Sequence, residues 1–137
     1  EKQVRKIGVV DKNVEKLISE FMPGPITLIL EKNDKLDDYI TNGKNTIAVR
    51  MATSNVLEEL IKKVGSPLFM TSANKSGEPE CKNIGEIEKL SPLLDGILYG
   101  EYSFGKASTI VDCRFGEIKI IRKGPISEKE IRDILSK

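Results

Sequence analysis

The segment PGPITLIL, residues 23–30, decides how this chain folds. Its two prolines end any helix that precedes them, because proline lacks the backbone N–H that a helix interior needs. Residues 26–30 are short, β-branched and almost continuously apolar, a pattern typical of a strand that is buried on both faces. We therefore predict an internal strand at residues 26–30.

A helix is predicted directly before this strand. Val14, Leu17, Ile18 and Phe21 follow the i, i+3, i+4, i+7 spacing of one helical face. Asp11 stands at the N-cap position, where a side-chain oxygen can accept from the unpaired backbone N–H groups of the first turn. The pattern predicts a helix that begins after Asp11 and ends before residue 23.

A second strand and a second helix are predicted after a polar, charged segment at residues 31–45. Residues 46–51 (TIAVRM) favour a strand, and residues 56–64 carry the apolar stripe of a helix that stops at Gly65. Residues 67–71 (PLFMT) predict a third strand, which a polar loop punctuated by Gly and Pro follows. Loops after buried strands are where binding sites concentrate.

The last third of the chain favours strands. A helix at about residues 84–90 is followed by strands at 96–99, 108–114 and 117–122, of which the last two form a hairpin turned at residues 115–116. This order of elements predicts a mixed sheet, because hairpins add antiparallel pairs to strands that helices connect.

A capping box begins the closing helix. Ser127 and Glu130 have the spacing at which each side chain caps the other's backbone N–H, and Ile131, Ile134 and Leu135 give the helix one apolar face. All these elements together predict an α/β fold with a twisted, open, mixed sheet flanked by helices.

The composition excludes several classes of active site. The chain has 137 residues, so we expect one domain over residues 1–137. It contains no His, and its two Cys, Cys81 and Cys113, lie far apart. This excludes Ser-His-Asp and Cys-His catalysis, and no metal site is expected. The 22 Lys and Arg nearly balance 21 Asp and Glu, so any RNA binding must be local.

The sequence also argues against a membrane protein. No apolar run approaches the roughly 20 residues that a spanning helix needs. Residues 1–6 lead into no apolar segment of the kind that follows a signal sequence's charged start. We therefore expect a cytoplasmic protein with reduced thiols.

Residues 100–108 (GEYSFGKAS) nearly spell a phosphate-binding P-loop. Ala107, however, occupies the position where a Ser or Thr must reach magnesium. A P-loop also requires a helix after its lysine, so that backbone N–H groups face the phosphate, whereas residues 109–111 (TIV) favour a strand. A true P-loop is therefore not expected.

Two other groups of polar residues suit anionic ligands. Residues 72–77 (SANKSG) place two hydroxyls and an amide after an apolar strand, which suits phosphate oxygens, although an ordinary Asx/Ser turn explains the same composition. Thr46 and Arg50 lie four residues apart, so they share a strand face. Arg50 and Arg122 end apolar strands and need a partner, either an anionic ligand or a carboxylate in a partly exposed ion pair.

Five successive segments resemble the signatures of a known family: FMPGPITLIL, NTIAVR, TSANKSGEP, STIVD and IIRKGPI. They are similar to the YrdC/YciO family of threonylcarbamoyl-AMP synthases, and the resemblance extends from about Val14 to the last residue. It implies a YrdC-like fold and an enzyme that makes threonylcarbamoyl-AMP from L-threonine, bicarbonate and ATP for tRNA modification. Mg-ATP is then a substrate, and the resemblance implies no tightly bound cofactor.

The resemblance also implies roles for matching positions. Lys82 is a departure, because the family usually carries Thr or Ser there, although a lysine can still reach phosphate as a point charge. No catalytic residue is implied. The implied nucleotide-binding residues are Thr46, Asn74, Lys82 and Arg122, and the implied threonine-binding residues are Arg50, Ser72 and Ser108.

The family's P-T-E-T-x-Y-G-L and K-x-R motifs do not occur in this sequence. The family's first strand and helix are therefore expected to be missing, which exposes apolar surface that invites self-association or a partner chain. An alternative of a different class is a non-catalytic module that binds nucleotide or RNA through Arg50, Lys82 and Arg122. A third is a YciO-type relative, or a carbamoyl-transfer domain of the hydrogenase-maturation type.

Overall fold

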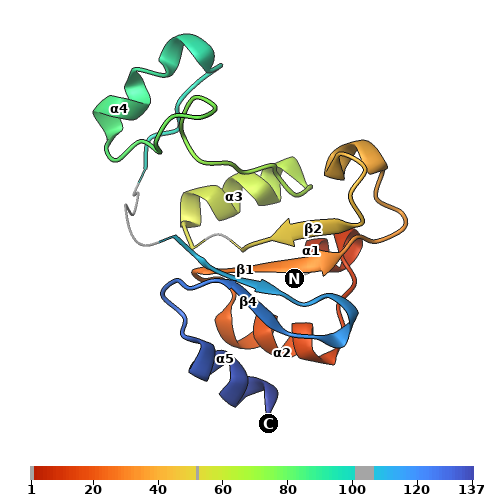
Figure 1. The fold of residues 1–137 in the computed structure, drawn as a ribbon. Helices are drawn as coiled ribbons and strands as arrows, with labels where there is room; N and C mark the ends of the chain where they lie inside the picture. Colours follow the sequence, from red (N-terminus) through yellow and green to blue (C-terminus); the bar gives the residue numbers. More distant parts are fainter. Residues whose placement is uncertain (1, 52, 101–106) are drawn as a thin grey trace. The chain divides into compact units, whose positions relative to one another are not determined.

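The computed structural model in Figure 1 describes residues 2–51, 53–100 and 107–137. The chain divides into two compact units, the first formed by Glu1–Asn55 with Lys106–Lys137 and the second by Val56–Gly105. The expectation of one domain over the whole chain stays a prediction. In the described part of the chain, no helix has the length and apolar character that crossing a membrane requires.

A four-stranded mixed sheet forms the centre of the first unit. Its strands are β1 (Ile26–Glu31), β2 (Thr46–Val49), β3 (Thr109–Asp112) and β4 (Lys119–Arg122). The strand order is β2-β1-β3-β4. β1 pairs in parallel with β3 and antiparallel with β2, while β3 and β4 are antiparallel. The mixed sheet confirms the predicted α/β fold class.

β1 lies inside the sheet, as predicted, but its two faces are not equally buried. Ile26, Leu28 and Leu30 are at most 1% exposed, whereas the alternate residues Thr27 and Glu31 are half-buried. The prediction of a strand buried on both faces is therefore wrong, because the continuous apolar run conceals a period-two alternation in burial. We call the half-buried side of the sheet, which carries Thr27 and Glu31, the Thr27 face.

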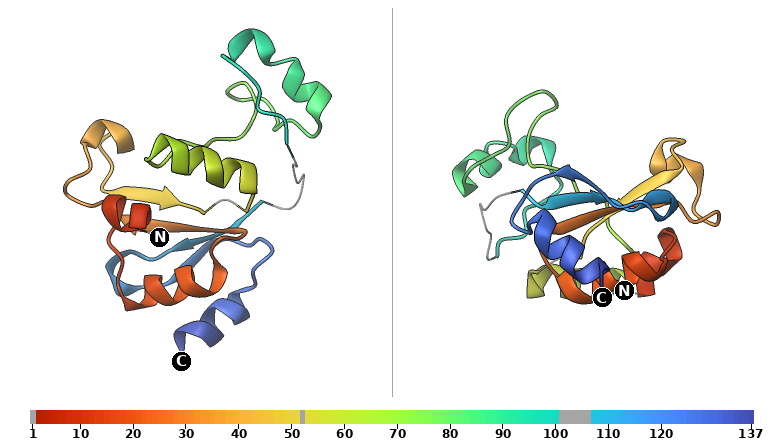
Figure 2. Two further views of the ribbon diagram at one scale, coloured as in Figure 1. Left: turned by 180° about the vertical axis from the view of Figure 1, so that it is seen from behind. Right: turned by 60° about the horizontal axis from the view of Figure 1, so that its bottom comes forward.

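Helices cover the other face of the sheet (Figure 2). The helical segments of this unit are α1 (Lys2–Ile7), α2 (Lys12–Phe21), η1 (Asp38–Thr41), η3 (Arg114–Gly116) and α5 (Glu128–Leu135). Leu17 from α2, Leu28 from β1 and Ile131 from α5 are fully buried in one core. Burial of these side chains against the sheet is the main stabilising term for the unit.

Both predicted helix N-termini are confirmed. The Asp11 carboxylate accepts a hydrogen bond from the backbone N–H of Val14 at 2.8 Å. At α5 the capping box is reciprocal, since Ser127 Oγ accepts from the Glu130 backbone and the Glu130 carboxylate accepts from the Ser127 backbone. These bonds satisfy N–H groups that have no partner inside the helix.

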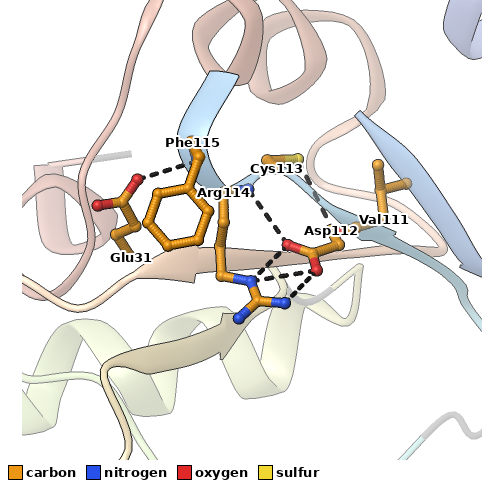
Figure 3. A network of polar contacts seen from close by, with 6 residues as sticks. All are labelled: Glu31, Val111, Asp112, Cys113, Arg114 and Phe115. Carbon is orange, nitrogen blue, oxygen red and sulfur yellow. Dashed lines mark hydrogen bonds and ion pairs between the residues drawn. The ribbon is translucent and has the colours of Figure 1, made fainter. Parts of the chain in front are cut away.

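The predicted hairpin is confirmed as well, with η3 as the turn between β3 and β4. Figure 3 shows how polar contacts fix this turn. Arg114 donates from Nη2 to Asp112 Oδ2 at 2.6 Å, and the backbone N–H of Phe115 donates to Glu31 Oε1 at 3.0 Å. The hydrogen bond from Arg114 lowers the pKa of Asp112. The network therefore ties the end of β1 to the hairpin.

The second unit consists of helical segments and loops. They are α3 (Asn55–Val64), α4 (Ile84–Glu88) and η2 (Ser91–Leu93). α3 ends where the sequence predicts, because Gly65 adopts a left-handed conformation with φ of 77°. The helix predicted at residues 84–90 is shorter than expected, and a separate 3-10 turn follows it.

Two strands predicted in the second unit do not form. Residues 67–71 and 96–99 are not paired with any strand in the described part of the unit, so these predictions are wrong. A strand is stable only when a neighbour satisfies its backbone groups and covers its apolar side chains. Here Phe69 and Met70 remain 78% and 71% exposed.

Replacing Thr109 by Val tests a buried hydrogen-bond pair in the core. The Thr109 hydroxyl donates to the Ile126 carbonyl at 2.7 Å and accepts from the Ile126 N–H at 3.1 Å. Thr109→Val keeps the shape but leaves both backbone groups unpaired, so the free energy of unfolding should fall by about 1–3 kcal/mol in urea denaturation. Thr41→Val in the surface turn η1 is the control, and an equal loss in both variants would contradict this account.

The Asp112–Arg114 pair makes stability depend on pH. Because the folded-state pKa of Asp112 is lowered, the pair stabilises the fold above the unfolded pKa of about 3.9, and this contribution is lost as pH falls through the folded pKa. Urea denaturation should therefore show a stability gap between the parent and Asp112→Asn at pH 7 that narrows as the pH falls below the unfolded pKa of about 3.9. A gap that stays constant down to pH 2 would rule the pair out as the cause.

Candidate functional site

The strand register gathers several of the predicted residues at one end of the sheet. Thr27 pairs with Ile110 of β3, and Ile110 pairs with Arg122 of β4, so the three side chains project from the Thr27 face. Ser108 precedes β3 by one residue, and Arg50 follows β2 by one residue. All these residues except Arg50 are joined by hydrogen bonds or strand pairing.

Ser108 is the centre of a three-residue hydrogen-bond cluster. Its Oγ lies 2.7 Å from Thr27 Oγ1 and accepts from Arg122 Nη2 at 3.1 Å. Arg122 Nε also donates to the backbone carbonyl of Ser108 at 3.0 Å. Ser108 is only 5% exposed, whereas Thr27 is half-buried and Arg122 is exposed. The structure thus brings two of the predicted site residues, Ser108 and Arg122, into direct contact.

Arg50 is held by the turn that precedes β1. Its Nε donates to the carbonyl oxygen of Gly24 at 3.2 Å. A Cβ at Gly24 would lie 2.1 Å from the Phe21 carbonyl oxygen, so no other residue fits this turn without moving the backbone. The PGP segment thereby fixes Arg50 next to the first residues of β1.

Thr46 lies at the opposite end of the sheet. It begins β2 and pairs with Glu31, the last residue of β1, so it also projects from the Thr27 face. Four residues of extended chain separate it from Arg50, or about 13 Å. The structure therefore places Thr46 on the Thr27 face but outside the Ser108 cluster.

The two predicted arginines differ from the other arginines in their partners. Arg5, Arg114 and Arg132 each pair with a carboxylate at 2.5–2.6 Å. Arg50 and Arg122 form no ion pair with any described residue and bond only neutral oxygens. Of the two partners that the sequence left open, a carboxylate is therefore not found within residues 2–51, 53–100 and 107–137. Two uncompensated guanidinium groups suit an anionic ligand.

The backbone at Gly124 packs closely against the backbone of Ser108 and Thr109. A Cβ at Gly124 would lie 2.4 Å from the Thr109 nitrogen and 2.6 Å from the Ser108 carbonyl carbon. Glycine is therefore required where the chain after Arg122 passes the start of β3. Sequence reasoning missed this residue and Thr27, although both stand inside the quoted segments IIRKGPI and FMPGPITLIL.

The remaining three predicted residues belong to the second unit. Asn74 Nδ2 donates to the carbonyls of Lys75 and Glu78 at 2.9 and 3.0 Å, so the loop is an internally bonded turn. This agrees with the alternative that the sequence left open. Asn74 Oδ1 is nonetheless buried, and no partner for it occurs among the residues with described positions. It is the atom that a ligand's donor or a water would satisfy.

Ser72 and Lys82 flank this turn with exposed side chains. The backbone N–H of Lys82 donates to the Glu86 carboxylate at 2.7 Å, at the start of α4, and Asn83 caps that helix. A cavity of about 310 Å³ lies within the unit. It is lined by Asn74, Lys75, Glu78, Pro79, Cys81, Glu86, Lys89 and Leu90.

The P-loop-like segment at residues 100–108 lies largely outside the described residues, which exclude 101–106. Its described end, Ala107-Ser108, leads into strand β3 rather than a helix. Burial raises the pKa of the Cys113 thiol to about 12, which disfavours the thiolate form that a nucleophilic cysteine needs.

The chain resembles proteins of one family along almost its whole length. The model of the Sua5/YciO/YrdC family, described as "Telomere recombination", matches residues 1–124. The threonylcarbamoyl-AMP synthase of Pyrococcus abyssi is 30% identical over 131 residues, which cover 92% of this chain and 38% of that protein.

Two solved structures agree with this similarity. The crystal structure of Pyrococcus abyssi Sua5 complexed with L-threonine is 29% identical, with a TM-score of 0.84, covering 97% of this chain and 40% of that one. Full-length HypF in its phosphate- and nucleotide-bound form is 25% identical, with a TM-score of 0.71 over 90% of this chain and 20% of that one. The chain spans about two fifths of the Sua5 protein, and it belongs to the Sua5/YciO/YrdC family.

Proposed function

We propose that this chain binds ATP and L-threonine and takes part in the synthesis of threonylcarbamoyl-AMP for tRNA modification. The observation that carries the proposal is the pair of arginines, Arg50 and Arg122, that have no carboxylate partner among the described residues. The carboxylate of threonine and the phosphates of ATP are anions that a guanidinium group binds in a bidentate manner. The Pyrococcus abyssi synthase and its Sua5 structure with bound L-threonine support threonine as a substrate, and the nucleotide-bound HypF structure supports a nucleotide.

The proposed reaction needs positioned donors rather than a nucleophilic side chain. The threonine amine first combines with bicarbonate to form a carbamate and releases water. A carbamate oxygen then bonds to the α-phosphorus of ATP, and pyrophosphate leaves. Such transfers are catalysed mainly by orientation and by cationic or amide donors aimed at the developing charge. A chain without His can therefore support this chemistry.

The proposal keeps the roles that the family resemblance implies. Mg-ATP, L-threonine and bicarbonate are the substrates, and the proposed location is the cytoplasm. The residues proposed for threonine are Arg50, Ser72 and Ser108, and those proposed for the nucleotide are Thr46, Asn74, Lys82 and Arg122.

A second candidate function is a non-catalytic module that binds nucleotide or RNA. Arg50, Lys82 and Arg122 are all exposed, so their charges are accessible to a phosphate backbone. This candidate needs no pyrophosphate release.

Binding of ATP tests the proposed nucleotide site. Isothermal titration of ATP into the parent chain should show saturable binding, which Arg122→Ala should weaken about tenfold or more because a charge-assisted hydrogen-bond donor is lost. Arg132→Ala is the matched control, since Arg132 is paired with Glu128 on the surface of α5. Absence of ATP binding by the parent, or equal weakening in both variants, would refute the site.

Pyrophosphate release separates the two candidate functions. An enzyme should release pyrophosphate from Mg-ATP only when L-threonine and bicarbonate are both present, because the carbamate is the attacking group. ATP binding without pyrophosphate release would instead favour the binding module.

A further inference from the structure

The hydrogen bond between Thr27 and Ser108 has a direction that its surroundings decide. The two hydroxyl oxygens lie 2.7 Å apart, so one hydroxyl donates to the other. Arg122 donates to Ser108 Oγ, and a guanidinium group can only donate. Ser108 therefore already accepts one bond, and its own proton must point elsewhere.

Burial settles where the Ser108 proton points. If Thr27 donated to Ser108, the Ser108 proton would need another acceptor. Ser108 is 5% exposed, and no further acceptor contacts its hydroxyl among the residues that the structure describes. An unpaired buried hydroxyl proton is costly. Ser108 therefore donates to Thr27.

The Thr27 proton is then left without an acceptor among the described residues. Thr27 is half-buried on the Thr27 face, and in this part of the chain its hydroxyl forms a hydrogen bond with Ser108 alone. Because each donor in the series from Arg122 through Ser108 to Thr27 polarises the next, the terminal O–H becomes a stronger donor. Such a group suits an anionic oxygen.

We propose that Thr27 is a ligand-contacting residue, the terminal donor of an Arg122–Ser108–Thr27 chain in which Ser108 is the inner link. Its hydroxyl donates to an anionic oxygen, which is a carboxylate oxygen of threonine or a phosphate oxygen of ATP. The inference rests on the proposed function and changes it in one respect, since Thr27 rather than the buried Ser108 meets the ligand.

The test compares four single variants and one double variant of the chain by isothermal titration, with L-threonine and ATP titrated separately to identify the ligand. Thr27→Val removes the hydroxyl and keeps the branched shape, so it should weaken binding of one ligand about tenfold. Thr27→Ser restores a hydroxyl and should return the affinity to within about twofold of the parent. Thr41→Val, in the surface turn η1, should bind as the parent does.

Ser108→Ala distinguishes an inner link from a direct contact. If Ser108 acts through Thr27, Ser108→Ala should weaken binding of the same ligand. The double variant with Thr27→Val should then bind less than about twofold more weakly than Thr27→Val alone, because the effects of residues in one network are not additive. Strong weakening by Ser108→Ala with none by Thr27→Val would overturn the inference and make Ser108 the contact. Failure of Thr27→Ser to rescue binding would also overturn it.

The outcome for the parent separates the two proposals. If the parent binds a ligand and Thr27→Val binds it equally well, only the inference about Thr27 falls. If the parent binds neither ligand, the proposed function falls and the inference falls with it.

Discussion

The parallel pairing of β1 with β3 is the constraint on which the rest of the site depends. It joins Ile26 to Thr109 and Thr27 to Ile110, bringing together residues that are 81 positions apart in sequence, Thr27 and Ser108. Parallel strands cannot be joined by a short turn, so this contact depends on residues far apart in sequence. The buried face of the same two strands carries the core of the first unit, so the core and the polar cluster share one framework.

The site keeps a positive charge because Arg50 and Arg122 have no carboxylate partner among the described residues. Elsewhere in the described chain arginines find carboxylates, as Arg114 finds Asp112, and their charge is neutralised. Arg50 and Arg122 bond carbonyl and hydroxyl oxygens instead. Neutral acceptors orient a guanidinium group without cancelling its charge, so these positions retain attraction for an anion.

The second unit is held together by local hydrogen bonds rather than by a buried core in its described residues. None of its described residues between 56 and 100 is buried, and its regular structure consists of short helical segments and bonded turns such as the one around Asn74. Local hydrogen bonds alone contribute little net stability, because the same polar groups form hydrogen bonds with water in the unfolded chain. Exposed side chains such as Phe69 therefore mark the surface on which further burial would stabilise this unit.

The sequence by itself determined the local elements and the segments that carry the site. The caps at Asp11 and Ser127 and the α3 stop at Gly65 depend on neighbouring residues alone, and all were predictable. The hairpin turn at residues 115–116 was predictable as well, although its Phe115 N–H also bonds the distant Glu31. Only the tertiary structure decided which predicted strands find partners, that Thr46 lies away from Ser108, and that Arg122 bonds Ser108 rather than a carboxylate. Strand pairing and charge pairing depend on residues distant in sequence, and no local pattern encodes which of them meet.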